Sequence, residues 1–228
     1  MLSEDDLSDT FPRFVLNDVT PLSLGIEVAG DVMSTIVQRN STIPTKKSGN
    51  YTTTVDNQEI IDVKILEGER SMTIDNNLLG EFKLRDIPPM PAGKASVDVT
   101  FDIDANGILN VSATEETTGN KNKITITNDA GHLSKEDIER MVATAEFYKS
   151  EDETNRYRAV SKFKLETYCY EIKKKISSGK ITSSVMKELD DAITKALEFS
   201  SANPTADARE YEKELKDLKV VTQRLLPK

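Results

Sequence analysis

The sequence is poor in the residues that reactive sites use most often. Its 228 residues include one cysteine, Cys169, one histidine, His132, and no tryptophan. A single cysteine excludes an internal disulfide framework and is typical of a reducing compartment. Because Cys169 lies among aromatic residues in a helical pattern, we interpret it as a small core residue. We assign neither Cys169 nor His132 a catalytic or metal-binding role.

Long apolar runs are also missing. Residues 1–6 are acidic and lack the apolar centre of a secretory signal, and no later run is long enough to span a bilayer. We therefore expect no membrane partner and a location in the cytoplasm, with the nucleus as an additional location.

Positive charge is in deficit. The chain has 30 Lys and Arg residues against 39 Asp and Glu residues, and its formal net charge is -9. Contact with a phosphate backbone needs a concentrated basic surface. This balance argues against nucleic acid as a partner.

Motifs of cofactor chemistry are missing too. The sequence has no phosphate-cradling glycine loop, nucleophile elbow, paired-cysteine metal site or dinucleotide-binding turn. Asp102, Asp104 and Asn106 are spaced as in the first half of an EF-hand calcium loop, but Ala113 stands where that loop needs its bidentate glutamate. We therefore predict that the chain is not an enzyme, has no catalytic residue and no metal site, and binds no cofactor.

The clearest structure that is present is a β-hairpin over residues 97–113. Apolar and polar residues alternate over 97–103, which puts the apolar side chains on one face of a strand. Asp104 suits the first position of a type I turn, and Gly107 supplies the positive φ that follows. Residues 109–113 then return as a paired strand, and a second sheet must cover the apolar face.

Short apolar runs separated by turn residues fill the region from Leu22 to Thr127. This regular spacing favours an antiparallel β-sandwich. Besides the hairpin, the expected strands are 22–28, 32–37, 51–55, 60–66, 79–84 and 123–127.

After Gly131 the apolar period changes from two residues to about three and a half, which indicates helices. The first helix is predicted from Ser134 to Ser178, and its charged run from Lys149 to Arg158 is expected to cross open surface as a strut. Two more helices are marked by Ile181 to Leu197 and by Tyr211 to Leu225. The predicted fold is a β-sandwich followed by an α-helical bundle, with an acidic tail and short apolar linker at 1–17, the sandwich at 18–130 and the helices at 131–228.

Six stretches carry a more specific pattern: 18–27 (DVTPLSLGIE), 40–46 (NSTIPTK), 56–58 (DNQ), 67–70 (EGER), 101–113 and 133–142. Together they closely resemble the substrate-binding half of the seventy-kilodalton heat-shock (DnaK-type) chaperones, most of all the eukaryotic cytosolic members. The likeness is continuous from Asp18 to Val142 and looser through the helices.

This resemblance implies a chaperone that binds extended apolar segments of unfolded proteins in a channel of the sandwich, with the helices as a lid. It also implies J-domain co-chaperones and self-association. From alternation alone the apolar channel residues would be ordinary core, and only the resemblance makes them a binding site. The family's channel positions fall on Ile26, Val28, Ala29, Tyr51, Thr52, Thr54, Gln58, Ile61, Val63 and Val97.

The sequence departs from the family pattern in two places that matter for the lid. The pair that arches over the peptide is Ala29 and Thr54, where animal cytosolic members have an aromatic residue at the second position. Ala92 stands where many members have an arginine that latches the lid. These two departures from the family pattern predict a looser lid and faster peptide exchange.

The nucleotide-binding domain of the family lies outside the stretches that match, so we expect this chain neither to bind nor to hydrolyse ATP. An alternative function is an assembly or regulatory module that contacts other chaperone subunits while its channel is vestigial. The apolar segment from Phe14 to Leu16 and the lost latch favour that alternative.

Overall fold

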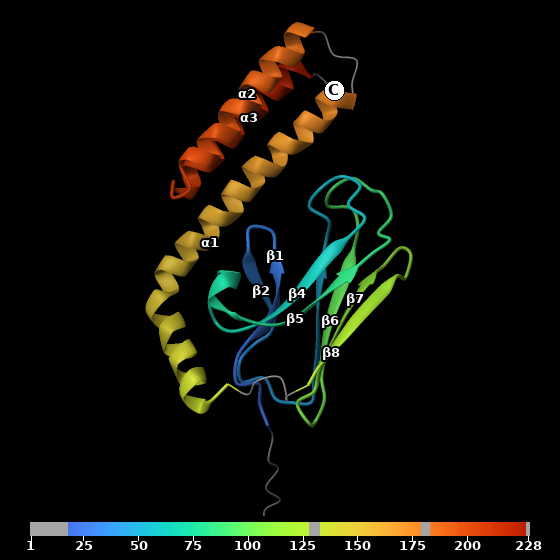
Figure 1. Cartoon of the computed structure of the whole chain (residues 1–228), viewed down its shortest axis with the longest axis vertical. Coiled ribbons are helices and arrows are strands. Elements are labelled where there is room, and N and C mark those ends of the chain that lie inside the picture. The colour runs from blue at the N-terminus through green and yellow to red at the C-terminus, as the bar shows by residue number, and fades with distance from the viewer. Residues whose placement is uncertain (1–17, 128–132, 179–182, 227–228) are drawn as a thin grey trace, which may run out of the picture.

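The computed structural model describes residues 18–127, 133–178 and 183–226 (Figure 1). All of the described strands precede the α-helices. The elements are β1 (Leu24–Val28), β2 (Val32–Val37), β3 (Thr45–Tyr51), β4 (Ile61–Glu67), the 3-10 helix η1 (Thr73–Asp75), β5 (Asn77–Leu84), β6 (Val97–Ile103), β7 (Leu109–Glu115), β8 (Lys121–Ile126), α1 (Lys135–Ser178), α2 (Ser183–Ala202) and α3 (Ala208–Leu225).

The strands form two four-stranded antiparallel sheets, ordered β2-β1-β4-β5 and β3-β6-β7-β8. Ile26 and Ile65 of the first sheet and Val99 and Phe101 of the second belong to one buried apolar core. Burying these side chains against each other is what holds the two layers together. Strands followed by helices are compatible with the predicted two-part fold.

The predicted hairpin is confirmed as β6 and β7, which pair from Val97 opposite Glu115 to Ile103 opposite Leu109. The Asp104 carboxylate accepts hydrogen bonds from the backbone N–H groups of Asn106 at 2.8 Å and Ile108 at 2.9 Å. These bonds close the turn, so the Asp104 side chain shapes the loop by accepting from the backbone that follows it.

The strand predicted at residues 51–55 is wrong, because β3 runs from Thr45 and ends at Tyr51. This strand lies at the edge of its sheet, and most of its side chains are exposed. It therefore lacks the apolar alternation that marks a half-buried strand. Its backbone pairing with β6 defines it instead, from Thr45 opposite Ile103 to Tyr51 opposite Val97.

The helices enclose a second apolar core that contains Cys169, Ile193 and Tyr211. Cys169 is fully buried, which confirms the prediction of a core residue. Burial and the nearby Glu166 carboxylate raise the pKa of its thiol to about 11. A thiol with so high a pKa is almost entirely protonated at neutral pH and is a poor nucleophile.

Some predictions lie outside the described residues: the tail and linker at 1–17, His132, the boundary between residues 130 and 131, and the start of the second helix at Ile181. Among the described helices, none is both long enough and apolar enough to cross a membrane.

Candidate functional site

The residues predicted to bind peptide lie at or near one end of the two sheets, which we call the loop end. Figure 1 shows the turns of this end facing the second half of α1. Both sheets contribute, because β1 and β3 finish here while β4 and β6 begin here. In chain order the residues are Ile26 and Val28 of β1, Ala29 of the next turn, Tyr51 of β3, Thr52, Thr54 and Gln58 of the β3–β4 loop, Ile61 and Val63 of β4, and Val97 of β6.

Burial divides these residues into two groups. Ile26, Val63 and Val97 are 5%, 1% and 1% exposed and belong to the core that the two sheets share. A guest side chain can therefore reach them only if the sheets move apart. The remaining predicted residues are partly buried or exposed: Val28, Ala29, Tyr51, Thr52, Thr54, Gln58 and Ile61.

Gln58 organises the β3–β4 loop. Its side-chain oxygen accepts hydrogen bonds from the Thr54 N–H at 2.9 Å and the Thr54 hydroxyl at 3.3 Å. Its side-chain amide donates to the Ile60 carbonyl at 3.0 Å. Two of the predicted residues thus contact each other and fix the shape of their own loop.

An ion pair docks α1 on the sheets. The Arg70 guanidinium donates to both carboxylate oxygens of Asp152, from Nε at 2.6 Å and from Nη2 at 2.8 Å, and the Ser71 N–H adds a bond at 3.2 Å. The Tyr148 ring centroid lies 4.7 Å from the guanidinium carbon. Burial opposes ionisation of Asp152, but the bonds from Arg70 and Ser71 outweigh it and hold its pKa below the usual value.

The prediction that Lys149 to Arg158 crosses open surface is therefore wrong at Asp152, which is 3% exposed. Its partner Arg70 lies 82 positions earlier in the chain. A local charge pattern cannot reveal such a pairing, because the same carboxylate would look identical on a solvated helix face.

The helix also touches the β1–β2 turn beside Ala29. Gly30 has a φ of +86°, and a Cβ placed on it would lie 3.1 Å from both the carbonyl carbon and the oxygen of Ala159 in α1. A side chain here would strain the turn and push against helix backbone. Glycine at this position thus lets α1 lie directly on the turn.

A third contact joins α1 to the β3–β4 loop. Lys174 donates from Nζ to the Asp56 carbonyl at 3.2 Å, while the Asp56 carboxylate accepts from the Ala92 N–H at 2.8 Å. Ala92, which stands where the arginine was expected, is thus held through its backbone N–H by Asp56. Lys174 of α1 bonds to the same Asp56. Sequence reasoning missed Lys174, which lies 118 positions from Asp56.

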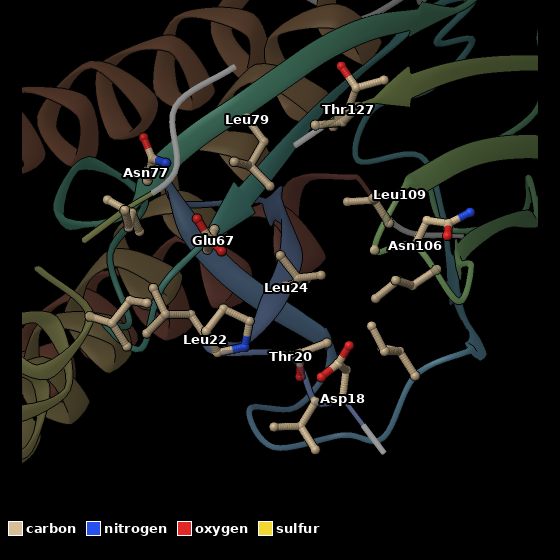
Figure 2. A pocket seen from close by; sticks show the side chains of 18 of the residues that line it. Asp18, Thr20, Leu22, Leu24, Glu67, Asn77, Leu79, Asn106, Leu109 and Thr127 are labelled. Carbon is tan, nitrogen blue, oxygen red and sulfur yellow. The ribbon is translucent and has the colours of Figure 1, made fainter. Parts of the chain in front are cut away.

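A cavity of about 490 Å³ lies at the opposite end of the sheets, which we call the base end (Figure 2). Its walls include Leu24 of β1, Leu79 of β5, Leu109 of β7 and Ile138 of α1. The size is within the range of small-molecule pockets. None of the predicted peptide-binding residues lines it.

Glu67 and Asn77 are two of the polar residues that line this cavity, and Figure 2 shows both side chains on its wall. They lie opposite each other on β4 and β5. Burial raises the pKa of Glu67, although a hydrogen bond from Asn77 opposes the shift. The sequence offers no sign of the cavity, because its lining comes from stretches far apart in the chain.

Comparison with known proteins identifies the relatives of this chain. The family model described as Hsp70 protein matches residues 7–228. The chain is 49% identical to a heat shock 70 kDa protein of Penicillium citrinum over 228 residues, which cover 99% of the chain and 45% of that relative. It is 50% identical over 228 residues to a heat shock 70 kDa protein of Emericella nidulans, covering 99% of the chain and 35% of the relative.

A more distant match is heat shock cognate 70 kDa protein 3 of Dictyostelium discoideum, 42% identical over 227 residues that cover 98% of the chain and 36% of the relative. The chain thus spans less than half the length of these relatives.

These matches overturn the predictions that the chain is not an enzyme and uses no cofactor. Proteins of the matched family are ATPases that bind ATP with a divalent metal ion, and the family match covers residues 7–228. The error arose because those predictions rested on missing local motifs and on a resemblance that covered only the substrate-binding half of the family. A motif search in a single chain cannot exclude chemistry that a family performs as a whole.

The divalent metal ion of the family finds no ligand cluster among the described side chains. Among residues 18–127, 133–178 and 183–226, no cluster of three or more His, Cys, Asp or Glu side chains could hold a metal ion. We therefore derive no ATP-dependent step from the described geometry.

Proposed function

Because this chain belongs to the Hsp70 family, we propose that its described part is a substrate-binding unit. In this proposal the two sheets form a β-sandwich that takes up an extended, apolar segment of an unfolded protein at the loop end, and α1 to α3 form the lid. The binding residues are those predicted above, from Ile26 to Val97.

One observation carries this proposal: α1 rests on the two loops that contain predicted residues. It touches Gly30, next to Ala29, and Asp56, between Thr54 and Gln58. A helix held across these loops by weak contacts can cover a bound segment and move away for its release. The ion pair with Arg70 anchors the same helix further from the loops.

The expected affinity is modest. Burying one leucine side chain of the peptide contributes roughly 1.5 to 3 kcal/mol. A few such contacts must offset an association cost of roughly 4 to 15 kcal/mol. The dissociation constant should then be roughly micromolar and tolerant of sequence.

Neighbouring isoleucines provide a matched test. Ile61 is partly buried against the shared core, whereas Ile60 is 41% exposed. Ile61→Glu would place a carboxylate in the proposed slot and should weaken binding of a labelled leucine-rich heptapeptide at least tenfold, because burying an unpaired charge is costly. Ile60→Glu adds the same charge and should change binding less than twofold.

Circular dichroism must show that both variants remain folded. Fluorescence anisotropy of the labelled peptide would measure binding. Absence of saturable binding by the unaltered chain at high micromolar concentration would refute the proposal, and so would equal losses for the two variants.

A second candidate function is an assembly or regulatory module whose channel is vestigial. The burial of Ile26, Val63 and Val97 to 5% or less favours it. In that case association with other chaperone subunits should not depend on peptide. Size-exclusion chromatography with light scattering, with and without the heptapeptide, separates the two functions.

Unfolded polypeptides and co-chaperones are the partners of the family. For this chain the specific partners remain predictions, including J-domain co-chaperones and self-association. The cytoplasmic location and the absence of nucleic-acid and membrane partners also remain predictions.

A further inference from the structure

The two edges where the sheets face each other are held by different groups. At one edge, side-chain amides of Asn120 and Asn122 donate to the carbonyls of Asp86 at 2.8 Å and Lys83 at 2.9 Å. At the other edge, between β2 and β3, the hydroxyls of Ser34 and Tyr51 lie 3.1 Å apart and form a hydrogen bond. We call this second edge the β2–β3 seam.

The hydroxyl pair joins the strands next to the proposed slot. Ser34 lies opposite Ile26 on β1, and Tyr51 lies opposite Val97 on β6. Residues opposite each other in a sheet share a face. Both hydroxyls therefore point to the same inner side as the two most central predicted residues.

Gly49 leaves room for the Tyr51 ring because it has no side chain. A Cβ on Gly49 would lie 2.9 Å from both Cε2 and the hydroxyl oxygen of Tyr51, so the ring leans back along β3 over the glycine. Burial raises the pKa of the Tyr51 hydroxyl, although the bond to Ser34 opposes the shift, and the group is protonated at neutral pH. The ring can thus hold its hydroxyl against β2.

We propose that the Ser34–Tyr51 pair is a clasp across the β2–β3 seam whose opening sets the rate at which peptide enters and leaves. This inference rests on the proposed function. Ile26 and Val97 are almost fully buried, so a guest side chain reaches them only when the sheets separate. The seam is the edge next to both, and one neutral hydroxyl pair is easily broken. Tyr51 thus holds the seam closed in addition to its predicted place among the peptide-binding residues.

Two conservative variants test the clasp. Tyr51→Phe keeps the aromatic ring, and Ser34→Ala keeps a small side chain in β2. Each variant removes the hydrogen bond between the two hydroxyls. Each should raise both the association and the dissociation rate of the labelled leucine-rich heptapeptide about fivefold, the factor for one net hydrogen bond. For Ser34→Ala, which alters no predicted binding residue, the dissociation constant should stay within about twofold, because a gate changes both rates together.

Three further variants sharpen this test. The double variant should exchange peptide no faster than either single variant. Ser34→Thr keeps a hydroxyl at this position and should therefore keep the slow rates of the unaltered chain. Ser48→Ala is the matched control: it removes a hydroxyl pair of 2.8 Å between β3 and Thr100 of β6. Ser48 is on the opposite, outer face of β3, so its loss should leave both rates unchanged.

Stopped-flow fluorescence measures the rates, and thermal unfolding checks that the variants are folded. Unchanged rates in Tyr51→Phe and Ser34→Ala would overturn the clasp while leaving the proposed function intact. Equal acceleration by Ser48→Ala would also overturn it, because general loosening of β3 would then explain the effect. No binding by the unaltered chain would overturn the proposed function and the clasp together.

Discussion

The loop end and the base end of the sheets differ in what fills them. At the loop end, buried apolar residues meet polar loops that bond to one another and to α1. At the base end, apolar walls surround a cavity of about 490 Å³. The residues that the family pattern marks for binding and the space that is already hollow are therefore in different places. Binding at the loop end would require opening, whereas the base end is open already.

The loop end also contains a buried carboxylate that the sequence does not distinguish from its exposed neighbours. Glu115 is fully buried at the end of β7, opposite Val97. It accepts hydrogen bonds from the N–H groups of Thr117 at 3.0 Å and Thr118 at 2.7 Å and from the Thr118 hydroxyl at 2.7 Å. Burial opposes its ionisation, but these bonds outweigh burial and lower its pKa to about 2.

The largest expected effect comes from breaking this cluster. Glu115→Gln should lower the free energy of unfolding at pH 7 by about 3 kcal/mol, the equivalent of the pKa shift. Because the folded-state pKa is lower than in the unfolded chain, the contribution is present above about pH 4.5 and is lost as the pH falls towards about 2. Urea unfolding of both proteins at several pH values would show the two stabilities converging in acid. A difference that stays constant with pH would contradict the assignment.

The next effect concerns the anchor of α1. Asp152→Ala should leave the largely buried Arg70 charge without its main partner, and should lower the free energy that holds α1 on the sheets by about 2 kcal/mol. Amide hydrogen exchange in residues 145–165 should accelerate about thirtyfold, the factor for that energy. Glu153→Ala removes an exposed carboxylate one residue further on and should leave exchange unchanged. Equal protection in both variants would show that the ion pair does not hold the helix.

A larger side chain at each end of the sheets would compare directly how tightly the loop end and the base end are packed. Val63→Phe at the filled loop end should destabilise the protein by about 1–3 kcal/mol through overpacking. Leu79→Phe at the base end should change stability by less than about 1 kcal/mol, because the added atoms can enter the cavity. Thermal unfolding measures both. A larger loss for Leu79→Phe than for Val63→Phe would contradict the comparison.

The smallest effect on stability is expected at the contact between the C-terminal end of α1 and the β3–β4 loop. Lys174→Ala removes one exposed bond to the Asp56 carbonyl and should cost no more than about 0.5 kcal/mol of global stability. Proteolysis within the β3–β4 loop should nevertheless become faster than in Lys173→Ala, which alters an adjacent exposed lysine. Identical cleavage rates in the two variants would show that the contact does not restrain the loop.

Much of the fold was predictable because the local spacing of apolar residues reveals it. The hairpin at 97–113 and the long helix α1 (Lys135–Ser178) follow from side-chain spacing alone. The edge strand β3 was not predictable in this way, since its exposed side chains carry no alternation. Its position depends on the strand beside it.

Less of the candidate site was predictable. The family pattern points to residues such as Thr54 and Gln58, and the structure places these two in contact. It did not reveal Lys174, Asp152 or the cavity, whose partners and walls come from distant stretches. The family match also corrected what the missing motifs had suggested about enzyme and cofactor.

By itself the sequence determined the hairpin and the helices, that Cys169 is a core residue, and which family pattern the chain carries. Backbone geometry imposes the periods of two and about 3.6 residues, so side-chain order alone reveals them. Only the tertiary structure decided which charges pair, which carboxylate is buried and which end is hollow. Those properties depend on how the two sheets and α1 meet, and no local pattern specifies the distance between residues that are a hundred positions apart.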